Sequence, residues 1–173
     1  MTDRKKTRSP RGVPLGIVMP ALASVLLFTI AVFAFVLPHF EASILTAKRE
    51  MLRELTEAVC NAWSSDHVGI RLSPSGVFND IRDSQPVEQF DYLIDQLNDF
   101  DLVYLHLMEP WMPIDDFPQY LRQVTAHYRK IFKNTIISNG GFDQAKGEAF
   151  VSVGISDLVA YGIKFLANPD LPE

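Results

Sequence analysis

Short apolar runs alternate with longer helical stretches over the C-terminal two-thirds of the chain, and this alternation restricts the possible folds most strongly. The apolar runs are 67–72, 102–107, 135–139 and 157–162, and the helical stretches between them are 86–100, 119–132 and 143–154. Strands that alternate with helices form parallel βαβ units with right-handed crossovers. The sequence therefore predicts an α/β fold with four parallel strands and functional groups at their C-terminal ends.

Two of the predicted strands end in loops that contain glycine. Asn139 ends the third strand and is followed by Gly140 and Gly141, and Gly162 ends the fourth. Because glycine has no Cβ, an anionic group can approach the main chain closely there. The glycine pair also precedes a predicted helix, whose first N–H groups are free to bind an anion. These loops either hold a phosphate between them or serve only as tight turns.

Four motifs occur in a fixed order along this region: VGIRLSP, YLHLMEP, IISNGGFD, and DLVAYG followed by FLANPDLP. Together they resemble the second half of the Old Yellow Enzyme family of FMN-dependent (β/α)8 barrels, over about residues 67–173. The resemblance implies that 64–173 forms the last four βα units of a partial TIM barrel. It also implies FMN as cofactor, NAD(P)H as reductant and activated alkenes as substrates.

The resemblance gives individual residues a role. Arg71 matches the arginine that contacts the flavin ring, although a strand-end arginine could instead pair with a carboxylate. Gly140 and Gly141 match the pair whose amides hold the FMN phosphate, and Gly162 matches the glycine of the second phosphate loop. Phe165 would lie near the flavin edge, a position that a core residue could equally occupy.

One position departs from the family pattern. The family usually has Gly-Arg at the second phosphate loop, whereas this chain has Gly162-Ile163. The change removes a charge-assisted phosphate contact. Lys164 is adjacent, but neighbours on a strand-like stretch point to opposite sides, so Lys164 is expected to be a poor substitute. His106 follows the strand pattern and is interpreted as structural.

The resemblance also points to groups that the sequence does not contain. In the family, the first half of the barrel supplies the Thr or Cys near the flavin, a Gln, the His pair or His/Asn pair that grips the substrate, and a Tyr proton donor. No His-x-x-His or His-x-x-Asn occurs in 1–173, and no catalytic residue is assigned. Because four strands cannot close an eight-stranded barrel, we expect little or no activity from this chain alone. A partner chain or self-association is expected to cover the open half barrel.

The N-terminal third has a different character. Residues 1–12 carry five Lys or Arg against one Asp, and no Asp, Glu, Lys or Arg occurs from Gly12 to Phe40. The run is long enough to cross a bilayer. We therefore predict an uncleaved transmembrane anchor over 13–38 with the N-terminus in the cytoplasm, in a bacterial inner membrane. The alternatives are a cleaved signal peptide, or a buried helix of a cytoplasmic protein.

Residues 39–63 are predicted to form a long amphipathic helix next to the membrane. Its apolar positions recur at helical spacing: Leu45, Leu52, Leu55, Val59 and Ala62. An ordinary surface helix explains the pattern as well as a partner-binding role does. The region also resembles the start of bacterial Cache-type sensors, through Leu37, Pro38, Glu41, Lys48, Arg49, Glu50, Leu52 and Leu55.

Composition excludes several classes of function. The net charge of −5 argues against a nucleic-acid-binding surface. Cys60 is the only cysteine, so an intrachain disulfide and a cysteine metal cluster are impossible. The four histidines lack ligand spacing, so no metal site is expected.

Three hypotheses remain from the sequence. The first is a truncated FMN-binding oxidoreductase joined to a membrane helix. The second is a membrane-anchored, sensor-like or interaction fragment without catalytic activity. The third is a gene-fusion remnant that is no functional product, because NAWSSDHVGIRL passes from the amphipathic helix into the barrel region without a linker.

Overall fold

A computed structural model of the chain describes residues 15–168 and residue 170. The predicted basic segment 1–12, the first two residues of the predicted anchor and most of the terminal PDLPE segment lie outside the described residues. The chain divides into two compact units, Met1–Thr46 and Ala47–Glu173.

The described part of the first unit is helical. It contains α1 (Leu15–Ala31), the π-helical segment η1 (Val32–Val36) and the start of α2 (Leu37–Trp63). Large apolar side chains are exposed along it, including Leu26 (61%), Phe33 (68%) and Phe28 (71%). By length and composition, Leu22–Trp63 is the one helix among the described residues that could span a membrane.

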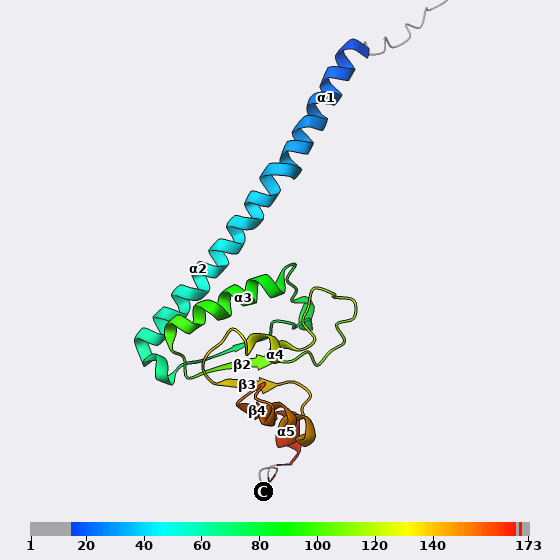
Figure 1. Ribbon diagram of the computed structural model, residues 1–173. Coiled ribbons are helices and arrows are strands. Elements are labelled where there is room, and N and C mark those ends of the chain that lie inside the picture. Colours follow the sequence, from blue (N-terminus) through cyan, green and yellow to red (C-terminus); the bar gives the residue numbers. More distant parts are fainter. Residues whose placement is uncertain (1–14, 169, 171–173) are drawn as a thin grey trace, which may run out of the picture. The chain divides into compact units, whose positions relative to one another are not determined.

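The second unit is built on a sheet of four parallel strands, as the sequence predicts (Figure 1). The strands are β1 (Gly69–Leu72), β2 (Tyr104–Met108), β3 (Ile136–Asn139) and β4 (Leu158–Ala160). Their spatial order is β1-β2-β3-β4, so each strand pairs in parallel with the next along the chain. The α/β fold predicted from the alternating pattern is confirmed.

Helical segments precede, connect and follow the strands. They are η2 (Ser65–His67), η3 (Phe78–Asp80), α3 (Pro86–Leu97), η4 (Asn98–Phe100), α4 (Val124–Tyr128), α5 (Gln144–Ser152) and α6 (Ile163–Ala167). Pro86 occupies the first turn of α3, where its fixed φ suits a helix start. Asp143 is the N-cap of α5, because its Oδ1 accepts a hydrogen bond of 2.8 Å from the Lys146 N–H.

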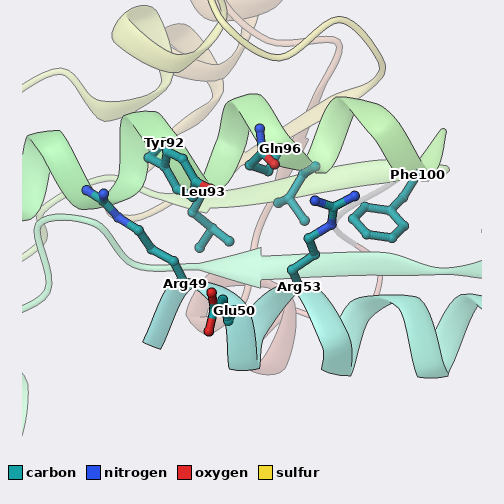
Figure 2. A pocket seen from close by; sticks show the side chains of 8 residues that line it. Arg49, Glu50, Arg53, Tyr92, Leu93, Gln96 and Phe100 are labelled. Carbon is teal, nitrogen blue, oxygen red and sulfur yellow. The ribbon is translucent and has the colours of Figure 1, made fainter. Parts of the chain in front are cut away.

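Within the second unit, α2 faces α3 with polar side chains. The Arg49 guanidinium lies 4.4 Å from the centroid of the Tyr92 ring and 3.3 Å from Glu88 Oε1. Figure 2 shows Arg49 and Arg53 extending from α2 beside a small hollow of about 170 Å³ that α3 also lines. Thr56, on the same helix, is 8% exposed.

The predicted apolar stripe of α2 does not face the core of this unit. Leu52, Leu55 and Val59 are 37%, 59% and 40% exposed, whereas Thr56 is buried and Cys60 is half-buried. The sequence pattern therefore identified an apolar face of this helix, but the second unit buries a different face of the helix. Burial raises the pKa of the Cys60 thiol.

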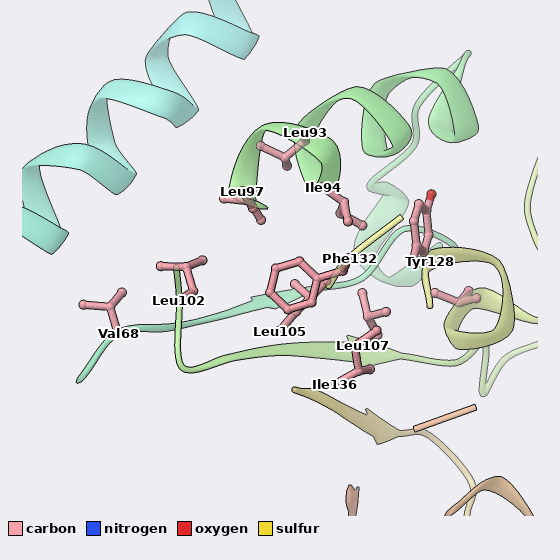
Figure 3. Packing of buried hydrophobic residues seen from close by; sticks show 11 residues of the cluster. Val68, Leu93, Ile94, Leu97, Leu102, Leu105, Leu107, Tyr128, Phe132 and Ile136 are labelled. Carbon is pink, nitrogen blue, oxygen red and sulfur yellow. The ribbon is translucent and has the colours of Figure 1, made fainter. Parts of the chain in front are cut away.

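The hydrophobic core lies between α3, α4 and one face of the sheet (Figure 3). Leu105, Leu107 and Ile136 are fully buried on that face, and Ile94 and Leu97 of α3 pack in the same cluster. Tyr128 of α4 is also fully buried, and its hydroxyl has no hydrogen-bond partner among the described residues. Burial raises the pKa of this hydroxyl, with a smaller contribution from Asp91.

Two local predictions are wrong. The helix predicted over 119–132 is present only as α4, because residues 117–120 form a turn and i→i+3 turns close the segment after Tyr128. The stretch that includes Ile163 and Lys164 was expected to be strand-like, but it is α6. The alternation of side chains used to discount Lys164 therefore does not apply.

Candidate functional site

The second face of the sheet lies opposite α3 and α4, and it carries the polar side chains of Arg71 and His106 together with apolar ones. The strand register places Arg71, His106, Ile137 and Leu158 in one row across the four strands. None of these four side chains is fully buried, whereas their neighbours Leu105 and Ile136 on the other face are. We call this surface the open face.

Arg71 is tied to the ends of the neighbouring strands. Its Nη2 donates to Asn139 Oδ1 at 3.4 Å and lies 3.5 Å from Met108 Sδ. Asn139 Nδ2 in turn donates to the Ala160 carbonyl oxygen at 2.8 Å. A chain of hydrogen bonds therefore joins β1 to the C-terminal ends of β3 and β4, where the two glycine loops begin.

The glycine pair after β3 requires backbone conformations that other residues rarely adopt. Gly140 has φ +117° and Gly141 has φ +62°. A Cβ on Gly140 would lie 2.5 Å from the Glu109 carbonyl oxygen, so a side chain there would collide with the main chain. A Cβ on Gly141 would meet no atom within 4 Å. Gly140 therefore fits the loop against β2, and Gly141 faces open space.

Glu109 holds this corner together. Its side chain is 4% exposed, and its two oxygens accept hydrogen bonds from the N–H groups of Val124 (3.0 Å) and Thr125 (2.7 Å). Its own N–H donates to the Asn139 carbonyl oxygen at 2.7 Å. A buried carboxylate at the start of α4 is favourable because it accepts the unpaired N–H groups of the first turn.

The loops after β3 and β4 meet in one open hollow of about 360 Å³. Its lining comes from both loops: Gly141, Phe142, Asp143, Ala160, Tyr161, Gly162, Ile163 and Lys164. A Cβ on Gly162 would also meet no atom within 4 Å. The structure thus brings Gly141 and Gly162 to the same hollow, with Ile163 and Lys164 beside them.

The lining of this hollow suits a phosphate only in part. Gly141 and Gly162 leave room for an anion next to the main chain, and Lys164 supplies a cation. Asp143 is an anion in the same lining, but its carboxylate is engaged with the Lys146 N–H. Ile163 is 86% exposed and contributes no charge. Lys164 is therefore the only lysine or arginine in the described lining of this hollow.

Phe165 stands apart from the other predicted residues. It is 49% exposed on α6 and does not belong to the lining of this hollow. The structure therefore places Gly141, Gly162 and Ile163 together, links Arg71 to them through Asn139, and sets Gly140 against Glu109.

His106 lies next to Arg71 on the open face, where it is half-buried. Its Nε2 has no hydrogen-bond partner among the described residues. Burial, and secondarily the Arg71 charge, lower the pKa of His106 below its ordinary value of 6.5. The His106 ring can therefore form a further hydrogen bond through Nε2 on the open face.

Sequence reasoning missed two residues, Asn139 and Glu109. Asn139 directly precedes the glycine pair, and Glu109 follows β2 in the YLHLMEP motif. Polar residues at the C-terminal ends of parallel strands are the signal that could have identified both. Among the described residues, no group of three His, Cys, Asp or Glu is arranged to hold a metal ion.

Comparison with known proteins identifies relatives of the second unit. Residues 47–173 match the model of the NADH:flavin oxidoreductase / NADH oxidase family. Among curated proteins, 12-oxophytodienoate reductase 1 from Oryza sativa subsp. japonica is 42% identical over 121 residues, which are 69% of this chain and 32% of the relative. Putative 12-oxophytodienoate reductase 6 from the same organism is 42% identical over 121 residues, covering 69% and 31%.

Solved structures give the same result. The old yellow enzyme from Trypanosoma cruzi matches with a TM-score of 0.65 and 31% identity, over 73% of this chain and 33% of that one. The old yellow enzyme homologue from Zymomonas mobilis matches with a TM-score of 0.66 and 27% identity, over 74% and 36%. The chain thus spans about a third of the length of the relatives that it matches.

The family match begins at residue 47, as does the second compact unit. It therefore includes Lys48, Arg49 and Glu50, on which the resemblance to Cache-type sensors partly rests. The C-terminal half of α2 belongs with the barrel region in this comparison.

Proposed function

Because the chain belongs to the NADH:flavin oxidoreductase / NADH oxidase family, we propose that its open face and the two adjoining loops bind FMN. One observation carries this proposal: the loops after β3 and β4 line a single hollow at the strand ends to which Arg71 is hydrogen-bonded through Asn139. In this proposal Arg71, the cation that contacts the ring, lies at the same end of the strands as the hollow that holds the phosphate.

In this proposal each residue has a distinct task. The main chain at Gly141 and Gly162 approaches the phosphate, and Lys164 supplies the charge that Ile163 lacks. Arg71 contacts the ring, and Asn139 holds the guanidinium in position. When bound, FMN supplies the hydride chemistry.

By family likeness, the reductant would be NAD(P)H and the substrate an activated alkene. The curated relatives are named as reductases of 12-oxophytodienoate, which supports an unsaturated carbonyl compound as the substrate class. We expect the chain alone to be weakly active or inactive, because the four strands of residues 15–168 make only part of an eight-stranded barrel.

Titration of the purified full chain with FMN in detergent tests the binding proposal. Flavin absorbance and fluorescence should change saturably, and Arg71→Ala should weaken binding about tenfold, the loss expected for one charge-assisted contact. Arg82→Ala, at another exposed arginine of the same unit, is the matched control. An unchanged FMN affinity in Arg71→Ala would remove Arg71 from the site.

We also propose that residues 13–38 attach the chain to a membrane with its N-terminus in the cytoplasm. The exposed apolar helix that includes Leu22–Leu37 supports attachment, and the basic residues of 1–12 support the orientation. If so, the chain should remain in the membrane fraction after alkaline extraction and dissolve only in detergent. Release by alkaline extraction alone would contradict an inserted anchor.

A membrane-anchored, sensor-like or interaction fragment without catalysis is the second candidate function. The exposed apolar stripe of α2 favours it, because such a face fits a partner better than water. Absence of any saturable flavin binding, together with membrane retention, would favour this candidate over the first.

A further inference from the structure

The sheet of the second unit has two edges that can extend. Among the described residues, β1 pairs only with β2 and β4 pairs only with β3. The outer edges of β1 and β4 therefore present backbone N–H and C=O groups without a strand partner in the described part of the chain. All four strands run in one direction, so an added strand that continues the pattern must be parallel to them.

Apolar side chains are also exposed on α2, the long helix that precedes β1 in the chain. The outward side of α2 carries Leu52, Leu55 and Val59 at one-turn spacing, with Met51 next to them. The inward side carries Arg49, which contacts Glu88 and Tyr92 of α3, and the buried Thr56. Figure 2 shows Arg49 extending from α2 toward Tyr92 of α3. The more apolar side of the helix is thus the side without a partner in this unit.

Apolar side chains are also exposed beside the β4 edge. An open hollow of about 540 Å³ lies there, lined by α5 and β4 residues that include Gly147, Val151, Leu158 and Tyr161. Val151 is 44% and Leu158 is 55% exposed. The β4 edge therefore combines free strand backbone with an unburied apolar surface, and α2, which precedes β1, carries a second unburied apolar surface.

We propose that two copies of this chain close one eight-stranded barrel, in which β4 of each copy pairs with β1 of the other. A two-fold axis parallel to the strands keeps all eight strands parallel, continues the order β1-β2-β3-β4 around the barrel and leaves no edge free. The outward side of α2 from one copy then covers the hollow beside β4 of the other.

The second copy is the occupant that the geometry favours. A lone β strand or a helix could cover one edge, but each would leave the other edge free. An identical copy covers both edges at once, because each copy offers a β1 edge and a β4 edge. Eight parallel strands are also the number that closes a TIM barrel. This inference concerns assembly and holds whether or not the open face binds FMN.

Paired cysteines test the arrangement directly. In a Cys60→Ser background of the full chain, Val59→Cys and Val151→Cys are combined and treated with a short bis-maleimide in detergent. The closed barrel places position 59 of one copy near position 151 of the other, so the double variant should give covalent dimers. Each single variant should stay monomeric on a denaturing gel, because equivalent positions lie on opposite sides of the barrel.

The control for this experiment is Val103→Cys combined with Val59→Cys. Val103 and Val151 are 42% and 44% exposed, but Val103 precedes the interior strand β2 and lies at neither edge. Absence of cross-linked dimers in the 59/151 variant would overturn the proposal. So would equal cross-linking in the single variants, or a ladder of larger products, which indicates open chains rather than a closed pair.

A charged substitution in the exposed apolar stripe of α2 provides a second, independent test. Val59→Glu should raise the dimer dissociation constant by at least about tenfold, because each dimer contains the changed residue at two interfaces. Val103→Glu, with the same substitution at nearly the same exposure, should leave it unchanged. Circular dichroism verifies that both variants fold. A mass by light scattering that is monomeric for the unmodified chain, or equal shifts in both variants, would overturn the proposal.

Discussion

The two faces of the four-stranded sheet differ although the same strands form both. On the covered face, Leu105, Leu107 and Ile136 are fully buried against α3 and α4. On the open face, Arg71, His106 and Asn139 alternate with them along the strands and remain partly exposed. Hydrophobic burial therefore stabilises one face, while hydrogen bonds and charge organise the other.

This difference shows how a βαβ segment can keep a stable core and still offer a polar surface. Successive strand residues point to opposite faces, so changes on the open face leave the core side chains in place. The open face can bind a ligand or a partner only where its polar groups remain unburied. Substitutions that differ by one position along a strand should therefore have different consequences.

Adjacent isoleucines on β3 give the largest expected contrast. Ile136→Ala should lower the free energy of unfolding by about 3 kcal/mol, because it leaves a cavity in the core. Ile137→Ala, on the open face, should cost about 1 kcal/mol or less in a single copy, and more where two copies enclose this face inside a barrel. Urea unfolding of both variants in the same detergent measures the difference. Equal losses would mean that the open face is buried in the chain as it exists in solution.

The two glycines after β3 should separate stability from binding. Gly140→Ala should destabilise the protein by about 2 kcal/mol, because its Cβ meets the Glu109 carbonyl oxygen at a positive φ. Gly141→Ala should cost only about 1 kcal/mol for its left-handed backbone, because its Cβ points into open space. If the loop holds a phosphate, Gly141→Ala should nevertheless lose FMN affinity, which thermal unfolding and titration together will show.

Asn139 should act on flavin binding through Arg71. Asn139→Ala removes the acceptor of the Arg71 guanidinium and should weaken FMN binding about tenfold, which corresponds to ~1.4 kcal/mol. In an Arg71→Ala background the same change should have little further effect. Asn61→Ala, on the exposed side of α2, serves as the control. Fully additive losses in the double variant would show that Asn139 does not act through Arg71.

The smallest expected effect concerns pH. Burial lowers the pKa of His106 in the folded protein, so the unfolded chain binds more protons in the range just below pH 6.5. Its contribution to stability is therefore complete above that value and is lost as the pH falls. His106→Gln should flatten the decrease of unfolding free energy with acidification. An unchanged slope in His106→Gln would contradict this assignment.

The sequence predicted the strands and their direction because short apolar runs bounded by glycine and polar residues have few other solutions. It predicted that Gly141 and Gly162 lie near each other because the C-terminal ends of parallel strands lie at the same end of the sheet. The role of Asn139 depends on a side-chain hydrogen bond to a residue 68 positions away, which no local pattern reveals. Likewise, Glu109, which follows β2, accepts the N–H groups of Val124 and Thr125 at the start of α4, a contact that no pattern within 119–132 reveals.

Lys164 is a second residue for which the local sequence pattern gave a wrong prediction. Its neighbours suggested a strand, in which Ile163 and Lys164 would point to opposite sides. In the helix α6 both line the hollow beside Gly162, so the lysine can act where the isoleucine cannot. Secondary structure at a chain segment this short is decided by tertiary contacts rather than by propensity.

A comparison of FMN with riboflavin, which lacks the phosphate, tests the central claim that the open face and its two loops form a flavin-phosphate site. The account predicts that the full chain binds FMN at least about tenfold more tightly than riboflavin, and that Lys164→Met removes most of this difference. Equal affinities for the two flavins in the unmodified chain would contradict the assignment of the hollow between Gly141 and Gly162 as the phosphate site.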